Sequence, residues 1–146
     1  MRLWHYKLLP YLPDAQFKGQ LREMVAILHD WRDKGKTNHL LINRVMEYPR
    51  KHLYRYFARY WSEYERRYGK RIDYHCCDQF IFFALGEEDD SLKLFWGWHN
   101  DRYLRVCMAN LYEKHVFGIG KSRITEEEWQ RLLDGYREIT GEDYQI

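Results

Sequence analysis

The chain has 146 residues, of which 45% are hydrophobic and 32% charged, as expected for one soluble globular domain. Its net charge is only +2, its longest apolar run, residues 80–85, is far shorter than the ~20 residues of a membrane span, and its N-terminus lacks a signal-peptide core. Three cysteines, two of them adjacent, make no disulfide framework. These features exclude membrane and disulfide-rich secreted proteins and predict a single cytoplasmic domain over residues 1–146 with no membrane partner.

The first predicted helix spans residues 14–34. Pro13 and Asp14 are typical of a helix start, and Gly35 is typical of a helix end. Apolar residues recur in steps of four and three, which indicates one buried helical face: Phe17, Leu21, Met24, Leu28 and Trp31.

The polar side of this helix carries the pair Arg22 and Glu23. Gly19, on the same face as Glu23, leaves room for another segment to approach the carboxylate. The expected neighbour is the N-terminal segment, residues 1–13, which contains two prolines and is predicted to be extended. Its free α-amine has an ordinary pKa of about 8 and is therefore an available nucleophile at neutral pH. On spacing alone, a solvated surface pair is the favoured interpretation of Arg22 and Glu23.

A second long helix is predicted over residues 49–68, after a short helix near residues 40–46 that Thr37 would cap. Its last residue precedes Gly69, which is a helix-end signal. The buried face of the long helix is expected to contain Leu53, Phe57, Tyr60 or Trp61, Tyr64 and Tyr68.

Another face of this helix is strongly basic. Residues 49–71 hold eight basic and two acidic residues, and four of the basic ones form a ladder with Tyr54 and Tyr56 nearby: Lys51, Arg55, Arg59 and Arg66. Such a ladder suits a track for DNA phosphates, with the aromatic rings available to bases. A solvated charged face is the alternative interpretation, and the spacing fits both.

Residues 72–98 fit either a short helix with a loop or a hairpin, because short apolar runs do not decide between them. A helix over residues 100–117 follows, capped by Asn100, and the last helix, residues 125–139, begins with a capping box of Thr125 and Glu128. The predicted architecture is all-α, a compact domain of about four helices with one irregular segment. One core is expected to contain Leu21, Leu28, Phe57, Leu104 and Leu111.

No metal or cofactor is predicted. The residues His75, Cys76, Cys77 and Asp78 are neighbours whose side chains diverge, and no second ligand pair stands at a suitable spacing. Cys107 lies on an apolar helical face, where a buried small hydrophobic residue is expected rather than a nucleophile.

Two stretches of the chain resemble the pyrimidine-dimer DNA glycosylase (endonuclease V-like) family. The first contains Leu12-Pro13, Gln16, Gly19-Gln20 and Arg22-Glu23, and the second is the stretch HNDRYLRVCMANLYEKHVFGI, residues 99–119, with a weaker likeness through residues 43–67. The resemblance implies a DNA glycosylase with abasic-site lyase activity that acts on double-stranded DNA. Its N-terminal amine attacks C1′ of the damaged nucleotide, an imine forms, and β-elimination nicks the strand.

By this resemblance Glu23 is the catalytic carboxylate, Arg22 contacts phosphate or sugar, and the amine belongs to Met1 or Arg2. Lys36 joins the basic ladder among the expected DNA contacts. The family's phage member exposes a threonine amine after loss of its methionine, whereas a residue as large as Arg2 generally blocks that removal, and Ala26 stands where the family has an arginine. A non-catalytic nucleic-acid-binding or interaction module on the same fold is the alternative function.

Overall fold

The computed structural model describes residues 2–36, 42–72 and 93–146, and within these ranges all regular structure is helical. The long helices are α1 (Asp14–Lys34), α2 (Arg50–Tyr68), α4 (Asp101–Phe117) and α5 (Glu126–Thr140). Three short 3₁₀ helices complete the set: η1 (Tyr6–Tyr11), η2 (Ile42–Glu47) and η3 (Gly120–Ser122). The predicted all-α architecture is thus confirmed. No helix in the described ranges is long and apolar enough to span a bilayer.

Proline and glycine set the ends of the long helices, as the sequence predicts. Pro13 and Pro49 precede the first residues of α1 and α2, and Gly35 and Gly69 close these helices in the left-handed conformation, with φ of 72° and 65°. The capping box of Thr125 forms at the start of α5. All four predicted helices therefore agree with the observed ones to within one residue.

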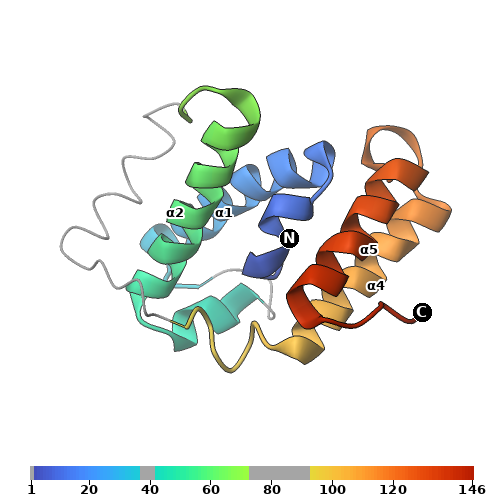
Figure 1. Cartoon of the computed structure of the whole chain (residues 1–146). Coiled ribbons are helices and arrows are strands. Elements are labelled where there is room, and N and C mark those ends of the chain that lie inside the picture. The colour runs from blue at the N-terminus through green and yellow to red at the C-terminus, as the bar shows by residue number, and fades with distance from the viewer. Residues whose placement is uncertain (1, 37–41, 73–92) are drawn as a thin grey trace.

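The N-terminal residues lie in the middle of the molecule. Figure 1 shows α1 and α2 on one side, α4 and α5 on the other, and η1 between them. The side chains of Leu3, Leu8 and Leu12 are fully buried, so this segment is a central part of the core. The Tyr56 hydroxyl donates to the Trp4 carbonyl at 2.7 Å and thereby ties α2 to the segment. Residues 2–5 are extended as predicted, whereas the 3₁₀ turn η1 follows in place of a fully extended run.

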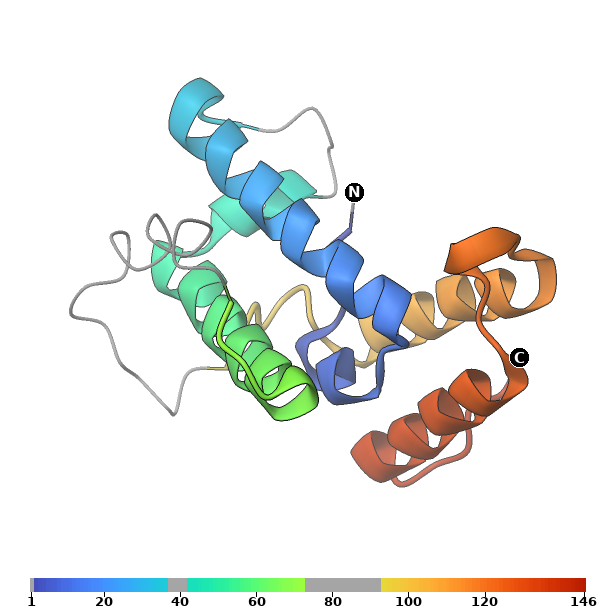
Figure 2. The same ribbon diagram turned by 90° about the horizontal axis from the view of Figure 1, so that it is seen from above.

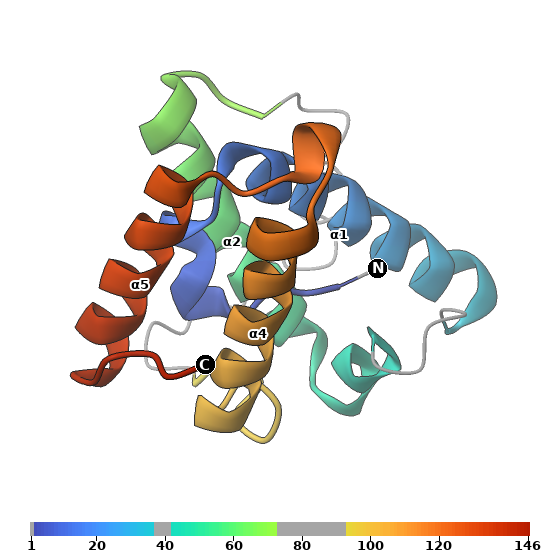
Figure 3. The ribbon, with the colours of Figure 1, turned by 90° about the vertical axis from the view of Figure 1, so that its right-hand side faces the viewer.

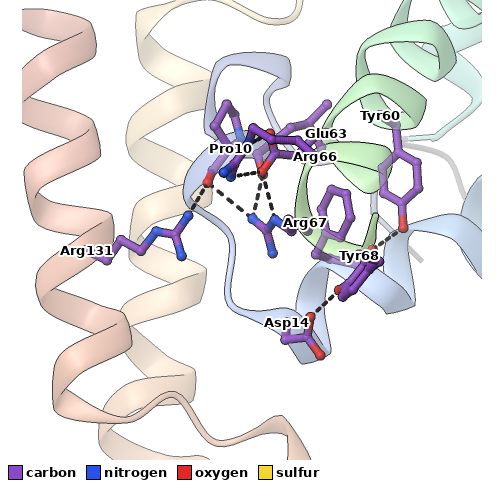
Figure 4. A network of polar contacts seen from close by, with 10 residues as sticks. Pro10, Asp14, Tyr60, Glu63, Arg66, Arg67, Tyr68 and Arg131 are labelled. Atoms are coloured by element: carbon purple, nitrogen blue, oxygen red, sulfur yellow. Dashed lines mark hydrogen bonds and ion pairs between the residues drawn. The ribbon is translucent and has the colours of Figure 1, made fainter. Parts of the chain in front are cut away.

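Two arginines hold η1 against α2 and α5 (Figure 4). Arg67 donates to the carbonyls of Leu9 and Pro10 at 3.0 and 3.2 Å, and Arg131 of α5 donates to Pro10 at 2.8 Å. Arg67 is also paired at 2.8 Å with Glu63, whose side chain is only 8% exposed. These bonds satisfy carbonyl groups of η1 that would otherwise lack partners where the three helices meet.

The helices share one core, with two corrections to the predicted set. Leu28, Phe57, Leu104 and Leu111 are buried as expected, but Leu21 is only partly buried. Tyr56, expected on the surface beside the basic ladder, is fully buried instead. The N-terminal segment packs on a flank of α2 that the periodicity assigned to solvent, and it covers this tyrosine.

Some predictions fall on residues that are not described. These are the cap at Thr37, the beginning of the short helix near residues 40–46, the metal alternative at His75–Asp78, and most of the segment 72–98. The short helix continues as the 3₁₀ helix η2, and Cys107 is buried as predicted.

A pair of buried histidines should make the fold sensitive to acid. His5 and His99 are 2% and 4% exposed, and their ring centroids lie 5.1 Å apart. Burial lowers the pKa of His5 to about 4, and burial together with the neighbouring His5 lowers the pKa of His99 well below its ordinary value. The Nδ1 atom of His99 accepts the Tyr6 amide at 3.1 Å, so the neutral ring carries its proton on the buried Nε2.

Because the folded-state pKa lies below the unfolded value, the unfolded chain binds more protons as the pH falls through 6.5. Between pH 7.5 and 5, His5 alone should lower the free energy of unfolding by about 2 kcal/mol, as measured by urea denaturation. The variant His5→Asn retains a cap for η1 and should flatten this dependence, whereas His29→Gln, at an exposed position, should not. Equal stability of the wild type at both pH values would contradict the prediction.

Candidate active site

The candidate site is built where the N-terminal segment crosses α1. The Arg2 amide donates to Glu23 Oε2 at 2.7 Å. One turn earlier on the same face of α1, Gln20 accepts the Trp4 amide and donates to the Arg2 carbonyl, both at 2.8 Å. A glutamine side chain can donate and accept at once, so it binds an extended backbone as a neighbouring strand would. The segment and the Glu23 carboxylate are thus fixed relative to each other.

The crossing point differs slightly from the predicted one. The segment was expected beside Gly19 and Glu23, but it lies over Gln20 and Glu23. A Cβ atom added at Gly19 would have one neighbour within 4 Å, the Arg22 guanidinium at 3.9 Å. Gly19 therefore faces open space, and Gln20 makes the contact because its amide matches the backbone of residues 2 and 4.

An open pocket of about 710 Å³ lies beside this crossing. Figure 3 looks onto this side of the molecule, where the N-terminal residues run between α1 and α4. One wall is formed by Arg2, Trp4 and Glu23, and the Arg2 guanidinium lies 5.2 Å from the centre of the Trp4 ring. The other wall comes from the end of α4 and the turn after it: Asn110, Glu113, Lys114, Phe117, Gly118, Ile119 and Ser122.

The pocket carries both signs of charge. Arg2 and Lys114 contribute positive charge, and Glu23 and Glu113 contribute negative charge from opposite walls. Glu23 is half-buried and fixed by its bond to the Arg2 amide, whereas Glu113 is exposed. A carboxylate held beside the beginning of the chain can stabilise a cationic intermediate formed on a nearby nitrogen and accept or return protons.

Two of the predicted catalytic residues meet in this pocket, and among the described residues Arg22 does not line it. Arg2 and Glu23 are in direct contact, while the neighbouring Arg22 is exposed on α1 and lies outside the lining. Met1 lies outside the described residues. Lys36 is exposed just past the end of α1, thirteen residues from Glu23, which corresponds to roughly 20 Å along the helix.

The basic ladder of α2 lies apart from the Glu23 pocket. Arg55, Arg59 and Arg66 line a different pocket of about 550 Å³, which shares no residue with the first. In Figure 2 the first described residues of the chain, in dark blue, emerge from behind α1 on the side opposite to α2. Arg59 is 5.0 Å from the centre of the Tyr6 ring, and Arg66 is paired with Glu63. Half-buried Lys51 completes the ladder.

Sequence reasoning missed the second wall of the pocket and the role of Gln20. The contacts of Gln20 join residues 16 and 18 positions apart, so no local pattern reveals them. A local signal existed for the wall, because the apolar residues Phe117 and Ile119 flank Gly118 where a helix ends and polar residues are expected.

The fold and site define a small helical protein whose N-terminal residues meet a helix carboxylate at an open pocket. Residues 1–75 match the family model described as pyrimidine dimer DNA glycosylase. This match covers just over half of the chain, and the chain belongs to that family. It includes Arg2, Gln20 and Glu23 but ends before α4, so the likeness expected through residues 99–119 is not part of it. No curated protein and no solved structure matches the chain significantly.

Proposed function

We propose that the protein is a DNA glycosylase with abasic-site lyase activity, acting on pyrimidine dimers or related lesions at the Glu23 pocket. The observation that supports this most directly is the 2.7 Å contact between the Arg2 backbone nitrogen and Glu23 Oε2 at the edge of an open pocket. An imine-forming enzyme needs an amine and a carboxylate together at a place that a sugar can reach. Family membership supplies the class of substrate, damaged DNA.

The proposed reaction uses only groups of the chain and of the DNA. The lone pair of the N-terminal amine forms a bond to C1′ while the glycosidic bond breaks. The base keeps the electron pair of the glycosidic bond and takes up a proton, and in a dimer it stays joined to the neighbouring base. The amine nitrogen loses one proton, the bond from C1′ to the ring oxygen breaks, and that oxygen takes up a proton, which gives a protonated imine that the Glu23 carboxylate stabilises. Removal of a C2′ proton then expels the 3′ phosphate and nicks the strand, and water finally releases the amine.

The position of the amine follows from the chain's first residue. The nitrogen beside Glu23 is that of Arg2, and it is an α-amine only in a chain that begins at Arg2. In a chain that retains Met1 it is an amide, whose lone pair is delocalised into the carbonyl. We therefore propose that the reactive form begins at Arg2, which requires that Met1 be cleaved off although a second residue as large as Arg2 generally blocks this removal. The Arg2 guanidinium, next to Trp4, is placed to meet a phosphate of the bound strand.

The test uses a duplex with a single pyrimidine dimer and the same duplex without damage. The protein should cleave the glycosidic bond of one base of the dimer and break the strand there, and it should leave the undamaged duplex intact. Binding to both duplexes with equal affinity and no cleavage of the glycosidic bond would support the alternative, a non-catalytic nucleic-acid-binding module.

The basic ladder is proposed as a separate contact with DNA phosphates. Changing Lys51 and Arg59 to alanine should weaken binding similarly on any sequence and flatten the dependence of log affinity on log salt by about one to two units, because fewer counterions are released. Arg137→Ala, an exposed change on α5, should leave the slope as it is. An unchanged slope in the double variant would show that the ladder is a solvated face.

A further inference from the structure

Two exposed apolar side chains stand at the rim of the Glu23 pocket. Phe117 is 77% exposed and Ile119 is 86% exposed, and both line the wall opposite Glu23. Large apolar groups in water gain nothing for the fold, and a contiguous exposed pair beside a pocket is typical of a binding surface.

The backbone holds this pair in a tight turn. The Gly118 amide donates to the Lys114 carbonyl at 3.1 Å, and a Cβ atom added at Gly118 would lie 2.1 Å from that oxygen and 2.9 Å from the Arg123 Cα atom. The Ser122 hydroxyl donates to the Ile119 carbonyl at 3.2 Å, and Gln16 of α1 donates to the Ser122 carbonyl at 2.9 Å. The turn is thus tied to the helix that carries Glu23, so Phe117 and Ile119 are preorganised relative to the carboxylate.

The charges around the pair suit a polyanion. Lys121 and Arg123 are exposed on the same turn, and Lys114 and Arg2 lie in the pocket. Of the nearby acids, Glu23 and Glu113 line the pocket, and Glu126 lies 3.0 Å from His115. Basic residues around an apolar centre match a nucleic acid, whose phosphates surround stacked bases.

We propose that Phe117 and Ile119 enter the DNA duplex at the lesion and pack against the bases that lose their stacking partner. This inference rests on the proposed function, because an enzyme whose amine attacks C1′ at a lesion needs the base stack to be opened there. Opening the stack leaves a gap between neighbouring base pairs, and apolar side chains inserted between base steps are an established way to hold a duplex open. The aromatic ring of Phe117 can stack on a base of any sequence.

The test measures nicking of abasic DNA by the wild type and by a double variant that carries both Phe117→Ser and Ile119→Ser. Each protein is given the DNA as a duplex and as a single strand. Nicking of the duplex should fall by roughly 5- to 150-fold, the range expected from loss of stacking on one base. Nicking of the single strand, which has no gap to fill, should be unchanged. The variant Phe117→Trp, which keeps an aromatic ring, should nick the duplex as the wild type does. Val106 is an exposed apolar residue elsewhere on α4, and Val106→Ser should leave nicking of both substrates unchanged.

Equal losses on both substrates, or no loss on either, would overturn the proposal. It would also fail if the wild type sedimented as a dimer and the double variant as a monomer, because a second copy of the chain would then cover the pair. If the wild type nicks neither substrate, the proposed function fails, and binding alone tests the inference. The wild type should then bind a duplex with a tetrahydrofuran abasic analogue more tightly than an undamaged duplex, and the double variant should bind both with equal affinity. A double variant that still binds the analogue duplex more tightly would overturn the proposal.

Discussion

Replacing Glu23 with glutamine should lower strand nicking on abasic duplex DNA by roughly 10²–10⁴-fold. The substitution keeps the size of the side chain and an oxygen that can accept the Arg2 amide, so the crossing of the N-terminal segment over α1 should persist. It removes the negative charge that would stabilise the protonated imine, and it removes the group that exchanges protons with the amine and the sugar. The fold and the affinity for duplex DNA should be largely unchanged.

Two other carboxylates make this experiment specific. Glu127→Gln, at an exposed position in the first turn of α5, should leave nicking as in the wild type. Glu113 is the other acid of the pocket, on the opposite wall. If Glu113→Gln lost the activity and Glu23→Gln kept it, the catalytic carboxylate would be Glu113, and the contact between Arg2 and Glu23 would be structural.

The identity of the first residue should have a comparably large effect. A chain released from a removable tag so that it begins at Arg2 should nick abasic DNA roughly 10²-fold faster, or more, than one that begins at Met1. The reason is geometric, because only the first chain places a free amine 2.7 Å from the Glu23 carboxylate, and displacement of a reacting group by a bond or two is enough to lose that much rate.

Acetylation of the N-terminus provides the control for this comparison. It should remove the nicking activity of the chain that begins at Arg2, because an amide nitrogen cannot form the imine. If the chain that begins at Met1 were as active as the other, the Met1 amine would be the nucleophile, and the Arg2 nitrogen would serve only to orient Glu23.

The helices could be predicted from the sequence because local signals determine them. Pro13 and Gly35 bound α1, Pro49 and Gly69 bound α2, and the apolar spacing inside each helix marks the face that packs. The burial of Tyr56 could not be predicted in this way. It depends on the N-terminal segment, which lies more than fifty residues away in the chain and covers a second face of α2 through the bond from Tyr56 to Trp4.

Of the two walls of the candidate site, only the one formed by α1 and the N-terminal segment was predictable from the sequence. The resemblance pointed to Glu23 and to the beginning of the chain, and the structure brings Arg2 and Glu23 together. The wall formed by Phe117 and Ile119 is separated from Glu23 by more than ninety residues, and only the packing of α4 brings it to the pocket. Periodicity describes one helix at a time, so a site shared by α1, α4 and an extended segment cannot be derived from it.

The central claim is that the nitrogen beside Glu23 is the nucleophile, and borohydride trapping tests it most directly. The chain that begins at Arg2 is mixed with abasic duplex DNA, and borohydride reduces any imine to a stable secondary amine. A covalent adduct should form, mass spectrometry of its peptides should place the DNA on the Arg2 α-nitrogen, and Glu23→Gln should reduce its yield. The absence of an adduct, or an adduct on a lysine side chain, would contradict the account.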